Sequence, residues 1–137
     1  MNSAEQVARA LELCAERDID PVPAIYDKFF AACDQAVEVM GHSDGPMRGR
    51  MAAQTFELLV DDNLIGEDSY LRWEIENHIG AYGVHADIYP AYFAAVKEAF
   101  REALEDCWSD VDEQAWNARI ALLQEDLDAH VAAQAAN

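Results

Sequence analysis

Apolar residues recur at steps of three and four along almost the whole chain, which is the spacing that puts side chains on one face of an α-helix. Between residues 89 and 107, Tyr89, Phe93, Val96 and Phe100 follow this spacing. No stretch alternates apolar and polar residues with a period of two for more than a few positions, as a half-buried strand would. The pattern therefore predicts an all-α protein.

Helix breakers divide this pattern into about six main helices. We expect Ser3 and Gln6 to form a capping box at the first helix, Asp20 and Pro21 to start the second, and Pro46 to start the third after the loop "GHSDGP". The expected helices cover about residues 4–17, 21–33, 46–60, 68–82, 86–106 and 110–135. Because no repeat or linker interrupts them, we expect one domain over residues 1–137, with frayed ends at about 1–3 and 134–137.

The composition is strongly acidic, and this narrows the range of partners. Nine basic residues stand against 27 acidic ones, a formal net charge of -18. Such a surface repels phosphate backbones and anionic lipids, so we expect no nucleic acid and no membrane as partner. The chain also has no leader pattern and no apolar run of the ~18 residues that a membrane span needs, which favours a cytoplasmic protein.

Three cysteines lie far apart within apolar helical patterns. Cys14, Cys33 and Cys107 are odd in number and lack the spacing of a zinc or disulfide framework. We therefore expect all three to be reduced, buried packing residues.

One histidine is the only candidate ligand that the pattern offers. The chain has no glycine-rich phosphate loop, CxxC, HExxH or serine nucleophile elbow. His78 alone among the four histidines sits in the middle of an apolar helical face, with Ile75 and Ile79. Periodicity by itself leaves two interpretations open, a core histidine with satisfied ring nitrogens or a ligand.

Two segments carry a resemblance to a known family. In "IYDKFFAACDQAVEVM" (25–40), Tyr26 and Phe30 are four residues apart, and in "HIGAYGVHADIY" (78–89), Val84 and Tyr89 are five apart. With a long final pair of helices whose last is opened by Trp116, this order resembles the bacterial single-domain globins over about residues 5–130. The resemblance implies a globin-like, three-over-three helical sandwich that binds haem b, with His78 as the axial ligand of the iron.

The resemblance also implies roles for other residues. Tyr26 matches the distal tyrosine and Tyr89 the tyrosine near the proximal histidine, while Met40 stands where most globins have a phenylalanine. Met51 falls at the distal histidine or glutamine position, with Arg50 and Gln54 as alternatives. Arg48 or Arg50 could pair with a haem propionate. The expected dry slot for the macrocycle is formed by Phe29, Phe30, Met51, Thr55, Ile75, Ile79, Val84 and Phe93.

The function implied is reversible binding of oxygen, nitric oxide or carbon monoxide at the haem iron, by a monomer or homodimer. One alternative is a haem-free globin-fold sensor or interaction module. Another is a haem peroxidase or nitric oxide dioxygenase, which would need an external reductase because the chain carries no flavin or nicotinamide module.

Overall fold

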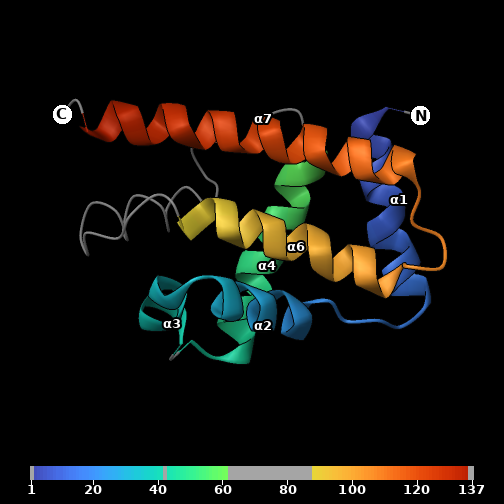
Figure 1. Cartoon of the computed structure of the whole chain (residues 1–137), viewed down its shortest axis with the longest axis horizontal. Coiled ribbons are helices and arrows are strands. Elements are labelled where there is room, and N and C mark those ends of the chain that lie inside the picture. Colours follow the sequence, from blue (N-terminus) through green and yellow to red (C-terminus); the bar gives the residue numbers. More distant parts are fainter. Residues whose placement is uncertain (1, 42, 62–87, 136–137) are drawn as a thin grey trace.

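All the regular secondary structure in the part of the chain that the structure describes is helical. The computed structural model describes residues 2–41, 43–61 and 88–135 (Figure 1). These residues form α1 (Ser3–Glu16), α2 (Val22–Ala32), α3 (Asp34–Met40), α4 (Gly45–Val60), α6 (Ile88–Ala103) and α7 (Asp110–Ala135). The predicted all-α class and a count of six helices are thus confirmed. The six include α3, expected only as a short segment, whereas the helix predicted over 68–82 lies outside the described residues.

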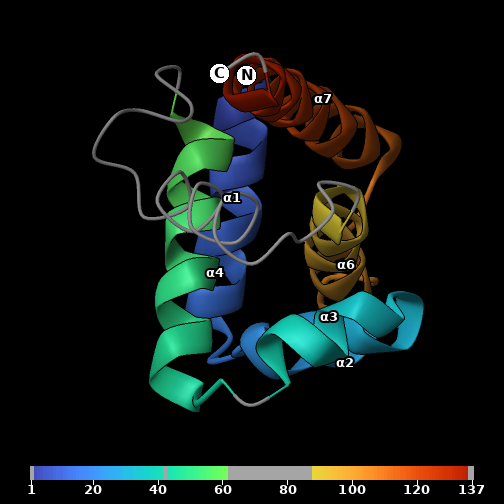
Figure 2. The same cartoon turned by 90° about the vertical axis from the view of Figure 1, so that its left-hand side faces the viewer.

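The helices enclose one interior. Figure 2 shows α1 and α4 side by side, with α2 and α3 across one end and α7 across the other. α6 lies between α2 and α7 and packs most extensively on α2, while α7 packs on α1 and α4 (Figure 1). No helix among the described residues is long and apolar enough to cross a membrane.

The first helix starts one residue earlier than predicted. Asn2 is its N-cap, and its Oδ1 accepts a hydrogen bond from the Glu5 amide at 2.8 Å. The predicted capping box of Ser3 and Gln6 is therefore wrong. Gln6 is buried instead and its Nε2 donates to Asp112 Oδ1 at 2.7 Å, which ties α1 to the start of α7.

Short polar side chains satisfy the amides at two other helix starts. Asp20 Oδ1 accepts from the Val22 amide at 3.0 Å before α2, and Asp44 Oδ1 accepts from the Met47 amide at 2.8 Å at the start of α4. These bonds satisfy amide groups that have no partner within the helix. Pro21 and Pro46 were each predicted as the first residue of a helix, but Pro21 is the N-cap of α2 and Pro46 is the second residue of α4. Neither position needs an amide hydrogen for the helix ladder, so both prolines are tolerated there.

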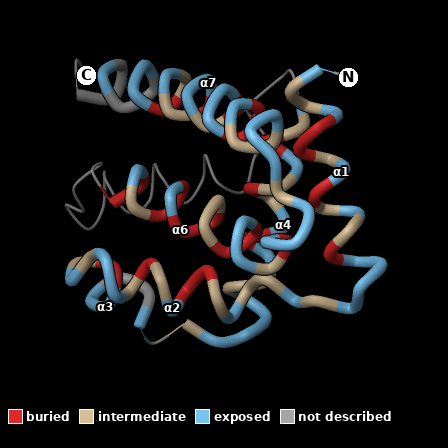
Figure 3. The backbone as a smooth tube through the Cα atoms, turned by 45° about the vertical axis from the view of Figure 1, so that its right-hand side comes forward, coloured by how far each residue is buried: buried red, intermediate tan, exposed pale blue. Residues whose placement is uncertain are grey.

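The buried apolar side chains form one continuous core. Figure 3 marks where the buried residues lie along the backbone. The largest fully buried side chains are Trp116, Tyr26, Tyr89, Tyr92, Phe29, Phe93 and Phe100. Burial of such aromatic groups is the main source of stability in a domain of this size.

One cysteine departs from the expected burial. All three thiols are free, with Cys14 buried, Cys33 half-buried and Cys107 exposed. The prediction that Cys107 packs in the core is wrong because α6 ends at Ala103. Cys107 therefore falls in the turn before α7 and leaves the apolar face that the helical pattern would have given it.

Candidate functional site

Most of the predicted site residues that the structure describes meet between α2, α4 and α6. Their side chains are almost fully buried, and Phe30 packs half-buried beside them. The buried members are Tyr26 and Phe29 on α2, Met51 and Thr55 on α4, and Tyr89 and Phe93 on α6. Residues from three separate stretches of sequence thus line the same interior.

Tyr92 lies among these side chains, although the sequence gave no reason to single it out. Its ring centroid is 5.2 Å from that of Phe29, 6.1 Å from Tyr26 and 6.0 Å from Phe93. It is fully buried. The spacing of one helical turn from Tyr89 was the available signal, but it competes with the stripe through Phe93, and the buried face of α6 proves broad enough to include both Tyr92 and Phe93.

Three hydroxyl groups come together at this point, and we refer to Tyr26, Thr55 and Tyr92 as the hydroxyl cluster. Thr55 Oγ1 donates to the main-chain oxygen of Met51 at 2.9 Å and lies 3.3 Å from the Tyr92 hydroxyl oxygen, with which it also hydrogen-bonds. Burial raises the pKa of Tyr92 from 10.0 to about 12, although hydrogen bonds with Thr55 and Tyr26 act in the opposite direction. The Tyr92 hydroxyl is therefore neutral at physiological pH and, like the Thr55 hydroxyl, is able to donate or accept a hydrogen bond.

The guanidinium of Arg48 lies over two aromatic rings of α2. The guanidinium carbon of Arg48 lies 5.2 Å from the ring centroid of Tyr26 and 5.0 Å from that of Phe30, within range of a cation–π interaction. Its Nε donates to Ser43 Oγ at 2.8 Å, which holds the side chain in place. Arg48 is thus next to the hydroxyl cluster.

The three candidates for the distal position differ in how deeply their side chains are buried. Met51 is buried and faces the interior, whereas Arg50 is exposed. Gln54 is half-buried, and its Nε2 lies 3.5 Å from Glu57 Oε2 on the same helix. Of the three side chains, the one in the interior is Met51.

A buried arginine fixes the end of α4. Arg119 on α7 is only 6% exposed, and its Nε donates to the Leu59 carbonyl at 2.6 Å. One of its terminal nitrogens donates to the Asp61 carbonyl at 2.9 Å. Carbonyl groups at the end of a helix lack partners within it, so this cation caps α4 where the described chain stops at Asp61. Sequence reasoning missed this role because Arg119 looks like a solvated helix residue.

Several predicted residues cannot be placed. His78, Ile75, Ile79 and Val84 lie outside the described residues, and so does the side chain of Met40 at the end of α3. Within the part of the chain that the structure describes, no group of three or more His, Cys, Asp or Glu side chains is arranged to bind a metal ion. A haem iron needs only one axial side chain from the protein, and that role was predicted for His78.

The types of residue described fit one side of a haem. Phe29, Met51 and Phe93 would supply apolar surface of the kind that a macrocycle needs, and the hydroxyl cluster contains groups that are able to donate a hydrogen bond. The guanidinium of Arg48 is of the right type to pair with a propionate.

Comparison with family models, with curated proteins and with solved structures gives no match in any of the three. The resemblance to globins therefore rests on the sequence motifs and on the agreement of their order with an all-α fold.

Proposed function

We propose that this protein is a haem-binding globin that reversibly binds a small diatomic gas, with His78 as the axial ligand of the iron. The observation that carries the proposal is the meeting of Tyr26, Thr55 and Tyr92, from three helices, in an interior otherwise lined by apolar side chains. These are the helices on which the sequence motifs placed a distal tyrosine and the lining of a haem slot.

The cost of burying hydroxyl groups supports a role beyond packing. A buried hydroxyl without a hydrogen bond costs about 1–3 kcal/mol, and even a paired one contributes little net stability. Phenylalanine and valine would fill the same space without that requirement. A cluster of three hydroxyls is therefore expected where a polar group must be recognised.

The chain's own residues would have different roles on the two faces of the haem. Haem supplies an iron centre that binds oxygen, nitric oxide or carbon monoxide. His78 would hold the iron through one ring nitrogen while its other N–H donates to an acceptor that orients the ring. Tyr26 would donate a hydrogen bond to a polar gas, and Phe29, Met51 and Phe93 would exclude water.

The proposal also includes a location in the cell, partners and an assembly state. Three free thiols suit the reducing cytoplasm, where disulfides are rare. The partners proposed are diatomic gases, with an external reductase if the iron must be kept ferrous, and the assembly is a monomer or homodimer.

The absorption spectrum of the purified protein tests this proposal directly. We expect a Soret band, either as purified or after addition of haem, and its shift on adding carbon monoxide to the reduced protein. The absence of a Soret band after haem addition would contradict the proposal. His78→Ala should lose the band while His130→Ala, a matched change near the chain end, should keep it.

Gas-binding kinetics test the role of the hydroxyl cluster. Tyr26→Phe removes one donor and keeps the ring, so we expect oxygen to dissociate about tenfold faster, which corresponds to roughly 1.4 kcal/mol for one hydrogen bond. Carbon monoxide is much less polar when bound, and its dissociation rate should change little. Equal effects on both gases would remove Tyr26 from the distal role.

A second candidate function is a haem-free sensor or interaction module with the same fold. The hydrogen bond between Thr55 and Tyr92 favours it, because it satisfies both hydroxyls without a ligand. Failure to take up haem, with the helical fold intact by circular dichroism, would support this candidate over the first.

A further inference from the structure

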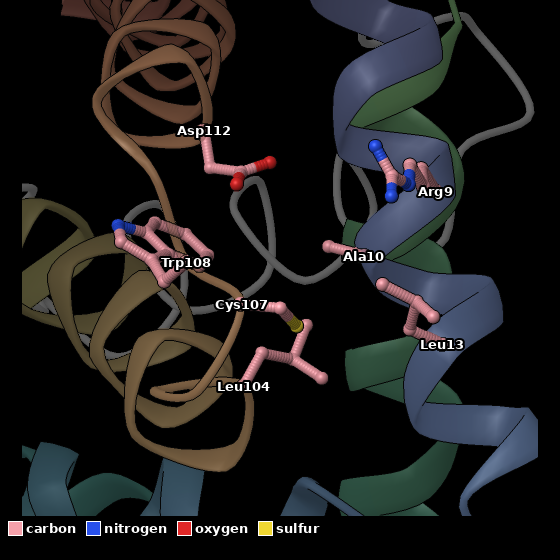
Figure 4. A pocket seen from close by; sticks show the side chains of 7 residues that line it. All are labelled: Arg9, Ala10, Leu13, Leu104, Cys107, Trp108 and Asp112. Atoms are coloured by element: carbon pink, nitrogen blue, oxygen red, sulfur yellow. The ribbon is translucent and has the colours of Figure 1, made fainter.

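The cavities beside α6 and the turn that follows it differ greatly in size. One lies between α1 and that turn and has a volume of about 20 Å³, which is enough for roughly one water molecule (Figure 4). The other is an open groove between α6 and α7 with a volume of about 350 Å³. Sites for small organic molecules usually start at about 300 Å³. Of these two cavities, only the groove between α6 and α7 has room for such a molecule.

This groove has an apolar middle and polar ends. The residues that line it are Pro90, Ala94, Lys97 and Glu98 on α6 and Asn117, Ile120, Ala121 and Gln124 on α7. The two helices run in roughly opposite directions, so the start of α6 lies at the same end of the groove as Gln124 (Figure 1). Ala94 and Ala121 are exposed and Ile120 is half-buried, which leaves hydrocarbon surface open to solvent. From Asn117 to Gln124 the groove is about 10 Å long, at the ~1.5 Å rise per residue of a helix.

The polar groups at the Asn117 end of the groove are already paired. Lys97 Nζ donates to Glu113 Oε2 and, at 2.9 Å, to Asn117 Oδ1. Asn117 Nδ2 donates to Glu113 Oε2 at 3.2 Å, which closes the network. Glu98 Oε2 accepts from a terminal nitrogen of Arg101 at 2.7 Å. Because charges and hydrogen bonds balance at this end, it offers little to the polar group of a ligand.

At the Gln124 end, a buried acceptor has no donor. Gln124 Nε2 donates to Asp128 Oδ1 at 2.9 Å, whereas Gln124 Oε1 is buried and has no hydrogen-bond partner in the described part of the chain. The bond to Asp128 fixes the orientation of the amide, since a carboxylate accepts only from the nitrogen. A buried acceptor without a donor costs about 1–3 kcal/mol. A ligand that supplies an N–H or O–H group to Gln124 would remove this cost.

The charges near Gln124 favour a donor that is positively charged. Glu125 and Asp128 follow Ala121 and Gln124 by one helical turn, and neither forms an ion pair among the described residues. Residues 120–137 contain no lysine or arginine, and residues 88–96 contain no charged side chain. The net charge of -18 attracts cations to the protein in general. An ammonium group fits both features, because it donates hydrogen bonds and carries a positive charge.

We propose that the groove between α6 and α7 binds an arylalkylamine, a small aromatic ring with a short chain that ends in a primary amine. The ring and chain lie against Ala94, Ile120 and Ala121. The ammonium group donates to Gln124 Oε1, and the carboxylate of Asp128 balances part of its charge. An apolar cavity of about 150 Å³ holds benzene, so the volume of this groove is sufficient for a ring with its chain. None of the lining residues belongs to the hydroxyl cluster or to the predicted haem slot, so the inference does not rest on the proposed function.

Titration of the full-length protein with three molecules of similar size tests this inference. Near neutral pH phenethylamine is a cation, phenethyl alcohol is a neutral donor and phenylpropionate is an anion. Nuclear magnetic resonance of the isotope-labelled protein should show saturable binding of one amine per chain, about tenfold weaker binding of the alcohol, and no binding of the acid. Added salt should weaken the binding of the amine and leave that of the alcohol unchanged.

Two variants with matched controls place the ligand in the groove. Gln124→Leu removes the acceptor at similar size and should weaken binding of the amine about tenfold, whereas Gln114→Leu, an exposed position on the same helix outside the groove, should not. Ala121→Phe fills the middle of the groove and should abolish binding of both the amine and the alcohol. Ala118→Phe adds the same ring at an exposed position that does not line the groove and should leave binding intact. Circular dichroism checks that each variant keeps its helical fold.

Asp128→Asn tests the charge at the Gln124 end. It should weaken binding of the amine several-fold and leave the alcohol unchanged, whereas Glu12→Gln, which removes one exposed charge on α1, should change neither. Three outcomes would overturn the inference: no saturable binding of the amine, equal binding of the alcohol or the acid, and binding that Ala121→Phe leaves unchanged. The last would mean that amines associate with the acidic surface without occupying the groove. Uptake of haem, or its failure, has no bearing on these three outcomes.

Discussion

Two aromatic regions of the core have similar spacing between their rings but contain different polar groups. At one end, the rings of Tyr26, Phe29 and Tyr92 have centroids 5.2–6.3 Å apart. At the other end, Phe56, Phe100, Trp108 and Trp116, which we name the indole cluster, pack with centroids 5.0–5.9 Å apart. The first region buries hydroxyl groups, whereas the second is mostly hydrocarbon.

The polar atoms of the two regions also differ in their hydrogen bonds. Thr55 and Tyr92 hydrogen-bond to each other in the interior. In the indole cluster, Trp108 Nε1 lies 3.4 Å from Glu113 Oε1 near the surface, and the buried Trp116 Nε1 has no acceptor among the described residues. The two regions thus differ in how their buried polar atoms are satisfied: the Thr55 and Tyr92 hydroxyls pair with each other, whereas the Trp116 N–H stays without an acceptor in the described part of the chain.

The largest expected effect comes from removing the centre of the indole cluster. Trp116 is fully buried against Phe100 and Trp108. Trp116→Ala should lower the free energy of unfolding by about 3–5 kcal/mol, because it removes a large buried surface and leaves a cavity. Urea or thermal unfolding followed by circular dichroism measures this change.

Trp116→Phe is the matched control for the same position. It keeps most of the buried ring surface and removes an indole N–H that has no acceptor in the described part of the chain, so its cost should be well below that of alanine. A cost for phenylalanine as large as that for alanine would mean that the N–H is essential, and the contrast between the two regions would fail.

The contrast also shows what the sequence could reveal. Helical spacing placed Tyr26, Thr55 and Phe93 on buried faces, and each is buried, because a single stripe on each helix is sufficient to predict which side faces inwards. Tyr92 escaped that reasoning because the buried face of α6 is broad. It includes a second line of residues, Ile88, Tyr92, Ala95 and Ala99, beside the stripe through Phe93.

Other features depend on tertiary contacts that no local pattern encodes. The buried position of Arg119 arises from carbonyl groups at the end of α4, 58 and 60 residues away in sequence. Gln6 likewise looked like half of a capping box, but Asp112, 106 residues away, binds its side chain. The exposure of Cys107 was missed because the apolar pattern continued beyond Ala103, where α6 in fact ends.

The next largest effect tests the hydroxyl cluster at high pH. The pKa of Tyr92 is 10.0 as an ordinary tyrosine and about 12 in the folded protein, so the folded state favours the neutral phenol. This contribution to stability is complete below pH 10 and is lost as the pH rises from 10 to 12, while the unfolded chain releases the proton first. The loss should total roughly 2–3 kcal/mol over this range.

Tyr92→Phe isolates that contribution from the other groups that titrate at high pH. At pH 7 the variant should lose about 1 kcal/mol for the hydrogen bond with Thr55. Between pH 10 and 12 its free energy of unfolding should fall less steeply than that of the wild type. Parallel curves for the two proteins, measured by urea unfolding at each pH, would show that Tyr92 is not protected from ionisation.

The smallest predicted effect concerns the cation beside the hydroxyl cluster. Arg48 lies over the rings of Tyr26 and Phe30 and hydrogen-bonds to Ser43, a combination that has no counterpart among the described contacts of the indole cluster. Arg48→Gln should lower the free energy of unfolding by about 0.5–1 kcal/mol, the usual range for a cation–π contact near the surface. Arg50→Gln, two residues away on the same helix and exposed, removes the same charge without contact to these rings and should change it by less than about 0.5 kcal/mol. Equal effects of the two variants would mean that only net charge matters in this very acidic chain. A larger loss for Arg48 would instead assign the effect to its contact with the rings that border the hydroxyl cluster.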